Sequence, residues 1–169
     1  MTHTCFRRRN RAAFVTAAVL VALQTTCVFG QPAAGDPPAA KTLWLLGRLP
    51  SAVDGALLAS CPCDLVGWRK YMMRLQNNNP IWSAPIRGLS PQELAGSVSP
   101  SVRVAVLVGA NDDVAPPAMS RAYAQILKKH VSDVTLTVAP GLGHEILLEP
   151  VTYEALKSLV ESLRRNGQR

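Results

Sequence analysis

Two short loops of the 169-residue chain carry the residue types that acid–base chemistry requires. The first loop, residues 109–116 (GANDDVAP), follows an apolar, β-branched run and contains Asp112 and Asp113. The second loop, residues 141–145 (GLGHE), follows the next such run and contains His144. A carboxylate that accepts a hydrogen bond from an imidazole fixes the tautomer of the ring and stabilises the imidazolium that forms in acyl transfer. We therefore predict a hydrogen bond between Asp112 and His144.

These loops need a sheet that brings them together, and the pattern of the chain predicts one. Apolar runs of strand length alternate with segments of helical periodicity. We expect strands at 53–60, 102–108 and 134–138, and helices at 41–49, at 65–76, from Pro117 onward and at 150–165. Strands that alternate with helices indicate a parallel sheet covered on both faces. The predicted fold class is therefore α/β, a three-layer α/β/α arrangement in which reactive loops gather beyond the carboxyl ends of the strands.

The order of these elements resembles the C-terminal part of the α/β-hydrolase fold. A strand, GxxDxxxP, a helix, a strand, GxGHE and a helix follow one another over roughly residues 53–165, and the pattern looks like that of the dienelactone-hydrolase and prolyl-oligopeptidase types. The resemblance implies that Asp112 is the acid and His144 the base of a Ser-His-Asp triad, with Asp113 as the alternative acid. It also implies a small-molecule ester or a peptide as substrate, and no cofactor.

The nucleophile of such a triad is not recognisable in the sequence. It belongs in a G-x-S-x-G elbow upstream of the acid, and neither this motif nor its cysteine version occurs in the 169 residues. Ser60 ends an expected strand, but the Cys-Pro-Cys that follows does not suit an elbow. The oxyanion-hole loop of the family is not found either. We therefore expect a truncated α/β-hydrolase fold, whose three-stranded sheet has an open edge that favours self-association.

Three functions are compatible with this pattern. In the first, the chain descends from a hydrolase, keeps only the acid and the histidine of the triad, and is inactive alone. Alternatively, it is a non-catalytic secreted binding module or pseudoenzyme, or one half of a complex in which another chain supplies the serine. Trp68 and Trp82 are candidates either for a lid over the site or for ordinary packing.

The charge of the chain does not indicate a nucleic-acid partner. The formal net charge is +7, with 18 basic and 11 acidic residues. The first segment, which has no acidic residue, contains a cluster of four arginines: Arg7, Arg8, Arg9 and Arg11. Without these four, the 18 basic residues fall to 14 against 11 acidic ones. No basic stripe interleaved with aromatic side chains is left, so the pattern of a nucleic-acid-binding surface is missing.

The arginine cluster instead suits a targeting signal. A basic stretch followed by the apolar run AAFVTAAVLVALQ and a small-residue segment ending at Gly30 is typical of a secretory signal peptide. We expect residues 1–30 to be this signal, an apolar helix that stays apart from the domain, with a linker at 31–40 and a partial hydrolase domain at 41–169. The mature protein would be periplasmic or extracellular, without a stable membrane span. The alternative is an uncleaved N-terminal anchor.

Cys5 and Cys27 would leave with the signal, so Cys61 and Cys63 are the cysteines of the mature chain. A disulfide between residues two apart closes a very small ring, and on a strand the two side chains point to opposite faces. We therefore expect two separate, mostly buried thiols. No second Cys or His pair has the spacing of metal ligands, so no metal site is predicted.

Overall fold

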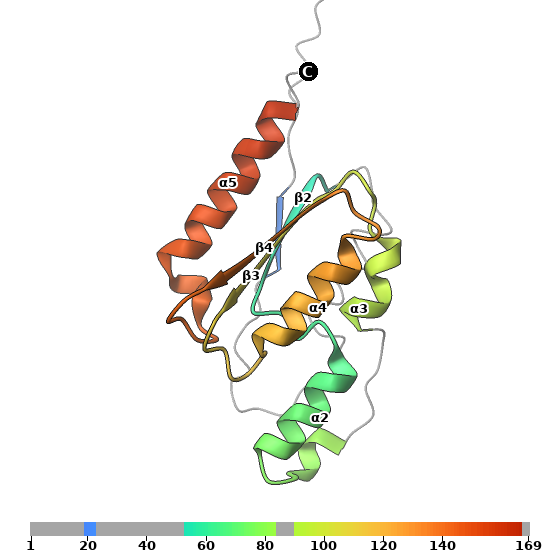
Figure 1. Cartoon of the computed structure of the whole chain (residues 1–169), viewed down its shortest axis with the longest axis vertical. Helices are drawn as coiled ribbons and strands as arrows, with labels where there is room; N and C mark the ends of the chain where they lie inside the picture. Colours follow the sequence, from blue (N-terminus) through green and yellow to red (C-terminus); the bar gives the residue numbers. More distant parts are fainter. Residues whose placement is uncertain (1–18, 23–52, 84–89, 167–169) are drawn as a thin grey trace, which may run out of the picture.

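The computed structural model describes residues 19–22, 53–83 and 90–166 (Figure 1). Its strands are β1 (Val19–Ala22), β2 (Gly55–Ala59), β3 (Arg103–Gly109) and β4 (Asp133–Ala139). Its α-helices are α2 (Leu65–Leu75), α3 (Pro91–Leu94), α4 (Pro117–Leu127) and α5 (Pro150–Asn166). Short 3-10 turns are η1 (Pro80–Ser83), η2 (Ala95–Ser97) and η3 (Ile146–Leu148). The helix expected at 41–49 and the linker at 31–40 lie outside the described residues.

The sheet is parallel throughout, with the strand order β1-β2-β3-β4. The three strands that the sequence predicts are confirmed as β2, β3 and β4. The last two pair along their whole length, from Arg103 opposite Asp133 to Gly109 opposite Ala139. An ion pair joins Arg103 Nε to Asp133 Oδ2 at 2.9 Å where this pairing begins. Because β3 and β4 end level, the loops that follow them begin side by side.

Each face of the sheet buries its own apolar cluster. One cluster packs against α4 and includes Leu58, Val106, Tyr123 and Leu127. The other packs against α5 and includes Leu57, Leu107, Ile146 and Leu159. Figure 1 shows α3 and α4 on one side of the sheet and α5 on the other. The predicted three-layer α/β/α arrangement is therefore confirmed.

Helices α2, α4 and α5 begin where the sequence predicts, whereas α3 is a short helix that the sequence does not predict. The N-cap of α2 is Asp64, whose carboxylate accepts a hydrogen bond from the Gly67 amide at 2.9 Å. Such caps satisfy one of the amides that the first helical turn leaves without a partner. Pro117 opens α4 and Pro150 opens α5, at positions where the missing N–H of proline has no helical partner to lose.

The described part of the N-terminal segment differs from the sequence prediction. Val19–Ala22 form β1 and pair with Gly55–Leu58 of β2, so the expectation of a separate apolar helix is wrong for these four residues. A short apolar, β-branched run suits a buried strand as well as a helix, and the edge of β2 offers it backbone hydrogen bonds. The sheet therefore has four strands instead of three. Cleavage and export stay predictions.

In the ranges 53–83 and 90–166, no helix is both long enough and apolar enough to span a bilayer.

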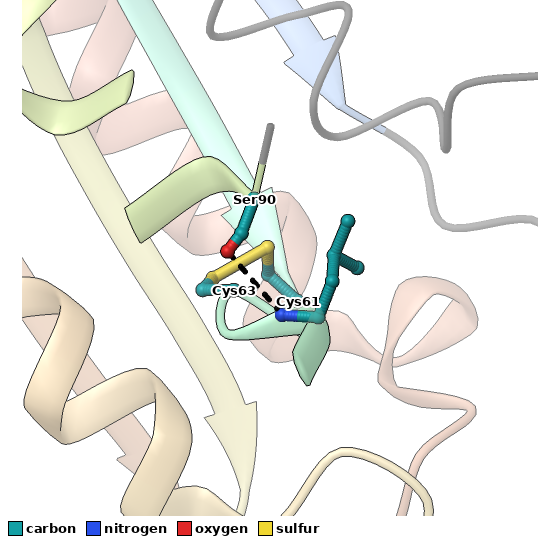
Figure 2. The surroundings of a disulfide bond; sticks show 4 residues. Cys61, Cys63 and Ser90 are labelled. Atoms are coloured by element: carbon teal, nitrogen blue, oxygen red, sulfur yellow. Dashed lines mark hydrogen bonds between the residues drawn. A yellow bond between two sulfur atoms is a disulfide. The ribbon is translucent and has the colours of Figure 1, made fainter. Parts of the chain in front are cut away.

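The two cysteines of the domain also differ from the prediction, because Cys61 and Cys63 form a disulfide (Figure 2). They lie beyond the end of β2, where strand alternation no longer holds, and the Cys63 amide donates to the Cys61 carbonyl at 2.8 Å. This tight turn brings both side chains to one side. Both residues are buried, as expected. The Cys63 carbonyl accepts from the Gln92 amide at 2.9 Å, which ties this turn to α3.

The central position of Leu107 gives a test of the fold. Leu107 is fully buried, and its partner in the register, Thr137, is exposed on the same face of β4. We expect Leu107→Ala to lower the free energy of unfolding by about 3 kcal/mol, because the substitution leaves a cavity. The matched change Thr137→Ala should cost less than about 1 kcal/mol. Urea unfolding of the full chain measures both, and equal costs would contradict the layer arrangement.

Candidate functional site

The site is built at the carboxyl ends of β3 and β4, where Asp112 and His144 meet. His144 Nδ1 lies 3.1 Å from Asp112 Oδ1 and 3.1 Å from Oδ2. The Asp112 side chain is fully buried, whereas that of His144 is 15 % exposed. The predicted hydrogen bond is thus present, between loops 32 residues apart. With Nδ1 directed at the carboxylate, Nε2 is the ring nitrogen left for another group.

Asp112 is held by the loop that carries it. Its Oδ1 accepts hydrogen bonds from the amides of Val114, at 3.0 Å, and Ala115, at 2.7 Å. Burial by itself raises the pKa of Asp112, but the hydrogen bond from His144, the Ala115 amide, the charge of His144 and the Ser60 hydroxyl all act in the opposite direction. These interactions outweigh burial and hold the pKa of Asp112 below its ordinary value of 3.8. The carboxylate is therefore the stable form of the buried group.

The two loops approach each other so closely that Gly109 must be a glycine. A Cβ there would collide with the carbonyl oxygens of Leu142 and Gly143. Of the two glycines that the sequence predicts for the histidine loop, Gly141 has a φ of +76°, which other residues rarely adopt. Gly143 is different, because a Cβ there would meet only Asn111 O, at 4.0 Å. The steric constraint therefore lies at Gly109 and the conformational one at Gly141.

The remaining residues that the sequence singles out take no direct part in this pair. Asp113, the alternative acid, is exposed, and no hydrogen bond joins it to His144 in the described part of the chain. Ser60 ends β2 with a left-handed φ of 48°, and its amide donates to Leu107 O at 2.8 Å. Its hydroxyl is buried, with no hydrogen-bond partner among the described residues. It lies near enough to lower the pKa of Asp112.

Two aromatic side chains of α2 contact residues 109–116, the loop that carries Asp112 and is called the acid loop below. The sequence gives no sign of these contacts. Trp68 Nε1 donates to Val114 O at 2.8 Å, and the Tyr71 hydroxyl donates to Asp113 O at 2.7 Å. The Trp68 ring also packs edge-to-face on Trp82, with ring centroids 5.3 Å apart. The two tryptophans therefore pack on each other, and the lid that the sequence also allows stays a prediction. Contacts between residues more than 40 positions apart leave no local signal in a sequence.

A pocket of about 190 Å³ lies beside His144, lined by Leu142, Gly143, His144, Glu145, Ile146 and Glu149. Pockets that enclose a small-molecule ligand usually measure at least about 300 Å³. The pocket beside His144 is therefore smaller than a typical small-molecule site. Among the residues that the structure describes, no group of three or more His, Cys, Asp or Glu side chains is placed to hold a metal ion.

Known structures share this architecture, although sequence comparisons find no match: no family model and no curated protein matches the chain. An esterase from Pyrococcus furiosus aligns with a TM-score of 0.57 at 16% identity, over 76% of this chain and 50% of the esterase. An acylaminoacyl peptidase from Pyrococcus horikoshii aligns with a TM-score of 0.52 at 13% identity, over 75% of this chain and 22% of the peptidase.

Both of these proteins have the α/β-hydrolase fold. The described domain accordingly has a partial α/β-hydrolase fold, as the order of its motifs predicts. The chain spans about half the length of the esterase.

Substitution of Gly109 tests the close approach of the two loops. Glycine to alanine usually stabilises a protein slightly where the backbone allows it, but at this position the new methyl group would force the loops apart. We expect Gly109→Ala to destabilise the protein by about 2 kcal/mol, measured by urea unfolding. The control is Gly143→Ala, which has open space around it and should change stability by less than about 0.5 kcal/mol. A neutral Gly109→Ala would mean that the loops are not in contact.

The lowered pKa of Asp112 predicts a particular acid sensitivity. A group whose pKa is lower in the folded than in the unfolded state contributes stability above the unfolded value, here 3.8. This contribution is lost as the pH falls through the folded pKa. Thermal unfolding from about pH 5 to pH 2 should therefore show a shallower decline for Asp112→Asn than for the wild type. Asp113→Asn, the exposed neighbour, should keep the wild-type slope; identical slopes for both variants would reject the shift.

Proposed function

We propose that Asp112 and His144 are the acid and the base of a Ser-His-Asp hydrolase mechanism that acts on ester or peptide bonds. The observation that carries this proposal is the hydrogen bond between Asp112 and His144 Nδ1, made by loops that follow neighbouring parallel strands of a partial α/β-hydrolase fold. The similarity to an esterase and to a peptidase supports the same class of reaction.

The chemistry follows from the two ring nitrogens. When Nδ1 carries a proton and donates to Asp112, Nε2 has a free lone pair that can accept a proton from a hydroxyl nucleophile. The imidazolium that results is stabilised by the buried carboxylate, which stays ionised because its pKa is lowered. Nε2 then returns the proton to the leaving group. The small exposed fraction of His144 suits this exchange, since the ring needs access on one side only.

The nucleophile and the oxyanion donors must come from elsewhere in this proposal. No G-x-S-x-G elbow occurs in the 169 residues, and the chain spans about half of the esterase that it resembles. Without a nucleophile beside Nε2 no acyl-enzyme forms, and without oxyanion donors the residual catalysis of a damaged triad is lost as well. We therefore propose that the chain is inactive alone and that a second polypeptide or a longer version of this one completes it.

The absent elbow also favours a second candidate, a non-catalytic binding module or pseudoenzyme. The coding DNA upstream of residue 41 distinguishes the two. A reading frame there that encodes a G-x-S-x-G elbow supports the hydrolase, whereas an intact junction between the signal and the linker, without such a frame, supports the binding module.

Labelling and turnover of the purified full chain test the proposal. We expect no hydrolysis of p-nitrophenyl butyrate above that of His144→Ala, and no labelling of any single serine by a fluorophosphonate probe, because both reactions need an activated hydroxyl. If the chain is completed by an elbow-containing segment, labelling should appear and should fall by roughly 10³-fold or more in His144→Ala.

The exposed His130 provides the matched control, since His130→Ala removes an imidazole that lies outside the site. Labelling of one serine in the chain alone, abolished by His144→Ala and unaffected by His130→Ala, would show that a nucleophile exists and that the proposed inactivity is wrong. Ser60 would then be the first residue to replace. Labelling of the completed protein that survives His144→Ala would reject the role of the pair.

A further inference from the structure

Helix α2 presents two hydrogen-bond donors to the acid loop from one of its faces. Trp68 and Tyr71 are three residues apart, so their side chains leave the helix on the same side. They donate to consecutive carbonyl oxygens, those of Val114 and Asp113. These carbonyls lie directly after Asp112 in the chain. The contact is therefore made with the same stretch of backbone that holds the carboxylate.

The geometry of the peptide unit links the two sets of hydrogen bonds. In a planar trans peptide the C=O and the following N–H point in opposite directions. The peptide between Val114 and Ala115 directs its N–H to Asp112 Oδ1, at 2.7 Å, and its C=O to Trp68, at 2.8 Å. The preceding peptide directs the Val114 amide to Oδ1, at 3.0 Å, and the Asp113 carbonyl to Tyr71, at 2.7 Å. Each peptide plane is held between Asp112 and a side chain of α2.

The α2 side of this arrangement is itself fixed. Trp68 packs on Trp82, whose Nε1 donates to Gln76 Oε1 at 2.7 Å. The first turn of the helix is capped by Asp64, and the Leu65 amide donates to Ser90 Oγ at 3.4 Å. Figure 2 shows Ser90 beside the Cys61–Cys63 disulfide. The helix is thus anchored at its start, next to the Cys61–Cys63 turn, and Trp68 is restrained at its ring.

We propose that α2 positions the acid, with Trp68 and Tyr71 as positioning residues that hold the acid loop in the conformation in which Asp112 faces His144. The proposal rests on the proposed function, because it assigns these residues to the acid of that mechanism. A donor at a carbonyl oxygen polarises the peptide and strengthens its N–H as a donor. Trp68 therefore acts on Asp112 through the Ala115 amide, and Tyr71 through the Val114 amide.

The experiment is a titration of the Asp112 side-chain carboxyl carbon by NMR in the full chain. Trp68→Phe keeps an aromatic ring but removes the donor, so the Ala115 amide should bind the carboxylate less strongly. We expect the pKa of Asp112 to rise, because the Ala115 amide hydrogen bond is one of the interactions that lower it, and the Ala115 amide proton to move upfield at neutral pH. Tyr71→Phe should give a smaller rise, because its hydrogen bond is exposed and water can replace the hydroxyl.

Trp82→Phe is the matched control, because it removes the same indole N–H from the same aromatic pair, but from a bond to Gln76, the C-cap residue of α2. It should shift the Asp112 titration less than Trp68→Phe does, because the hydrogen bond from Trp68 to Val114 O stays in place. An unchanged titration in Trp68→Phe, or an equal rise in Trp82→Phe, would overturn the proposal. If Trp68→Phe does not fold, Tyr71→Phe decides, and the absence of any rise at Asp112 or of an upfield shift of the Val114 amide rejects the positioning role. None of these readouts depends on turnover, so a failed hydrolase assay does not affect them.

Discussion

The hydrogen bond between Asp112 and His144 depends on one constraint, which is that two loops leave neighbouring parallel strands at the same level and in direct contact. The register of β3 and β4 sets the level, since Gly109 lies opposite Ala139. The absence of a side chain at Gly109 permits the contact, because the carbonyls of Leu142 and Gly143 occupy the space that a Cβ would need. The Asp112–His144 pair and the sheet that carries it therefore depend on the same packing.

The same arrangement explains how a carboxylate is kept buried and charged. Burial of an ionised group is unfavourable unless hydrogen bonds compensate for the lost hydration. Asp112 accepts hydrogen bonds from two backbone amides of its own loop and is hydrogen-bonded to the imidazole of His144 on the neighbouring loop. The backbone donors are held in turn by α2, so helix, loop and sheet all contribute to the state of one side chain.

Much of this could be predicted from local sequence patterns. The run at 102–108 is apolar apart from Arg103 and rich in valine, and Pro117 opens a helix, so β3 and α4 follow from rules that act within a few residues. The pairing of Asp112 with His144 could also be predicted, because each comes directly after a strand and parallel strands end at the same edge. Gly109 opens the GxxDxxxP motif, but the reason for a glycine there lies in the carbonyls of Leu142 and Gly143, whose position the sequence does not show.

Features that depend on distant or ambiguous contacts could not be predicted. Val19–Ala22 have the composition of both a signal helix and a buried strand, and only the edge of β2 decides between them. Cys61 and Cys63 would point apart on a strand, but they lie on a tight turn beyond it, whose position depends on where β2 ends. The contact of Trp68 with the acid loop joins residues 46 positions apart. Its existence depends on the packing of α2, which periodicity alone does not specify.

The most direct test of this account is the tautomer of His144, read from long-range ¹H–¹⁵N correlations of the full chain at a pH where the ring is neutral. If Asp112 orients the imidazole, Nδ1 should carry the proton and Nε2 should show the nitrogen shift of an unprotonated, basic position. In Asp112→Ala this preference should be lost, whereas Asp113→Ala should preserve it. A neutral ring protonated at Nε2 in the wild type would contradict the account, because the nitrogen assigned as the base would already hold its proton.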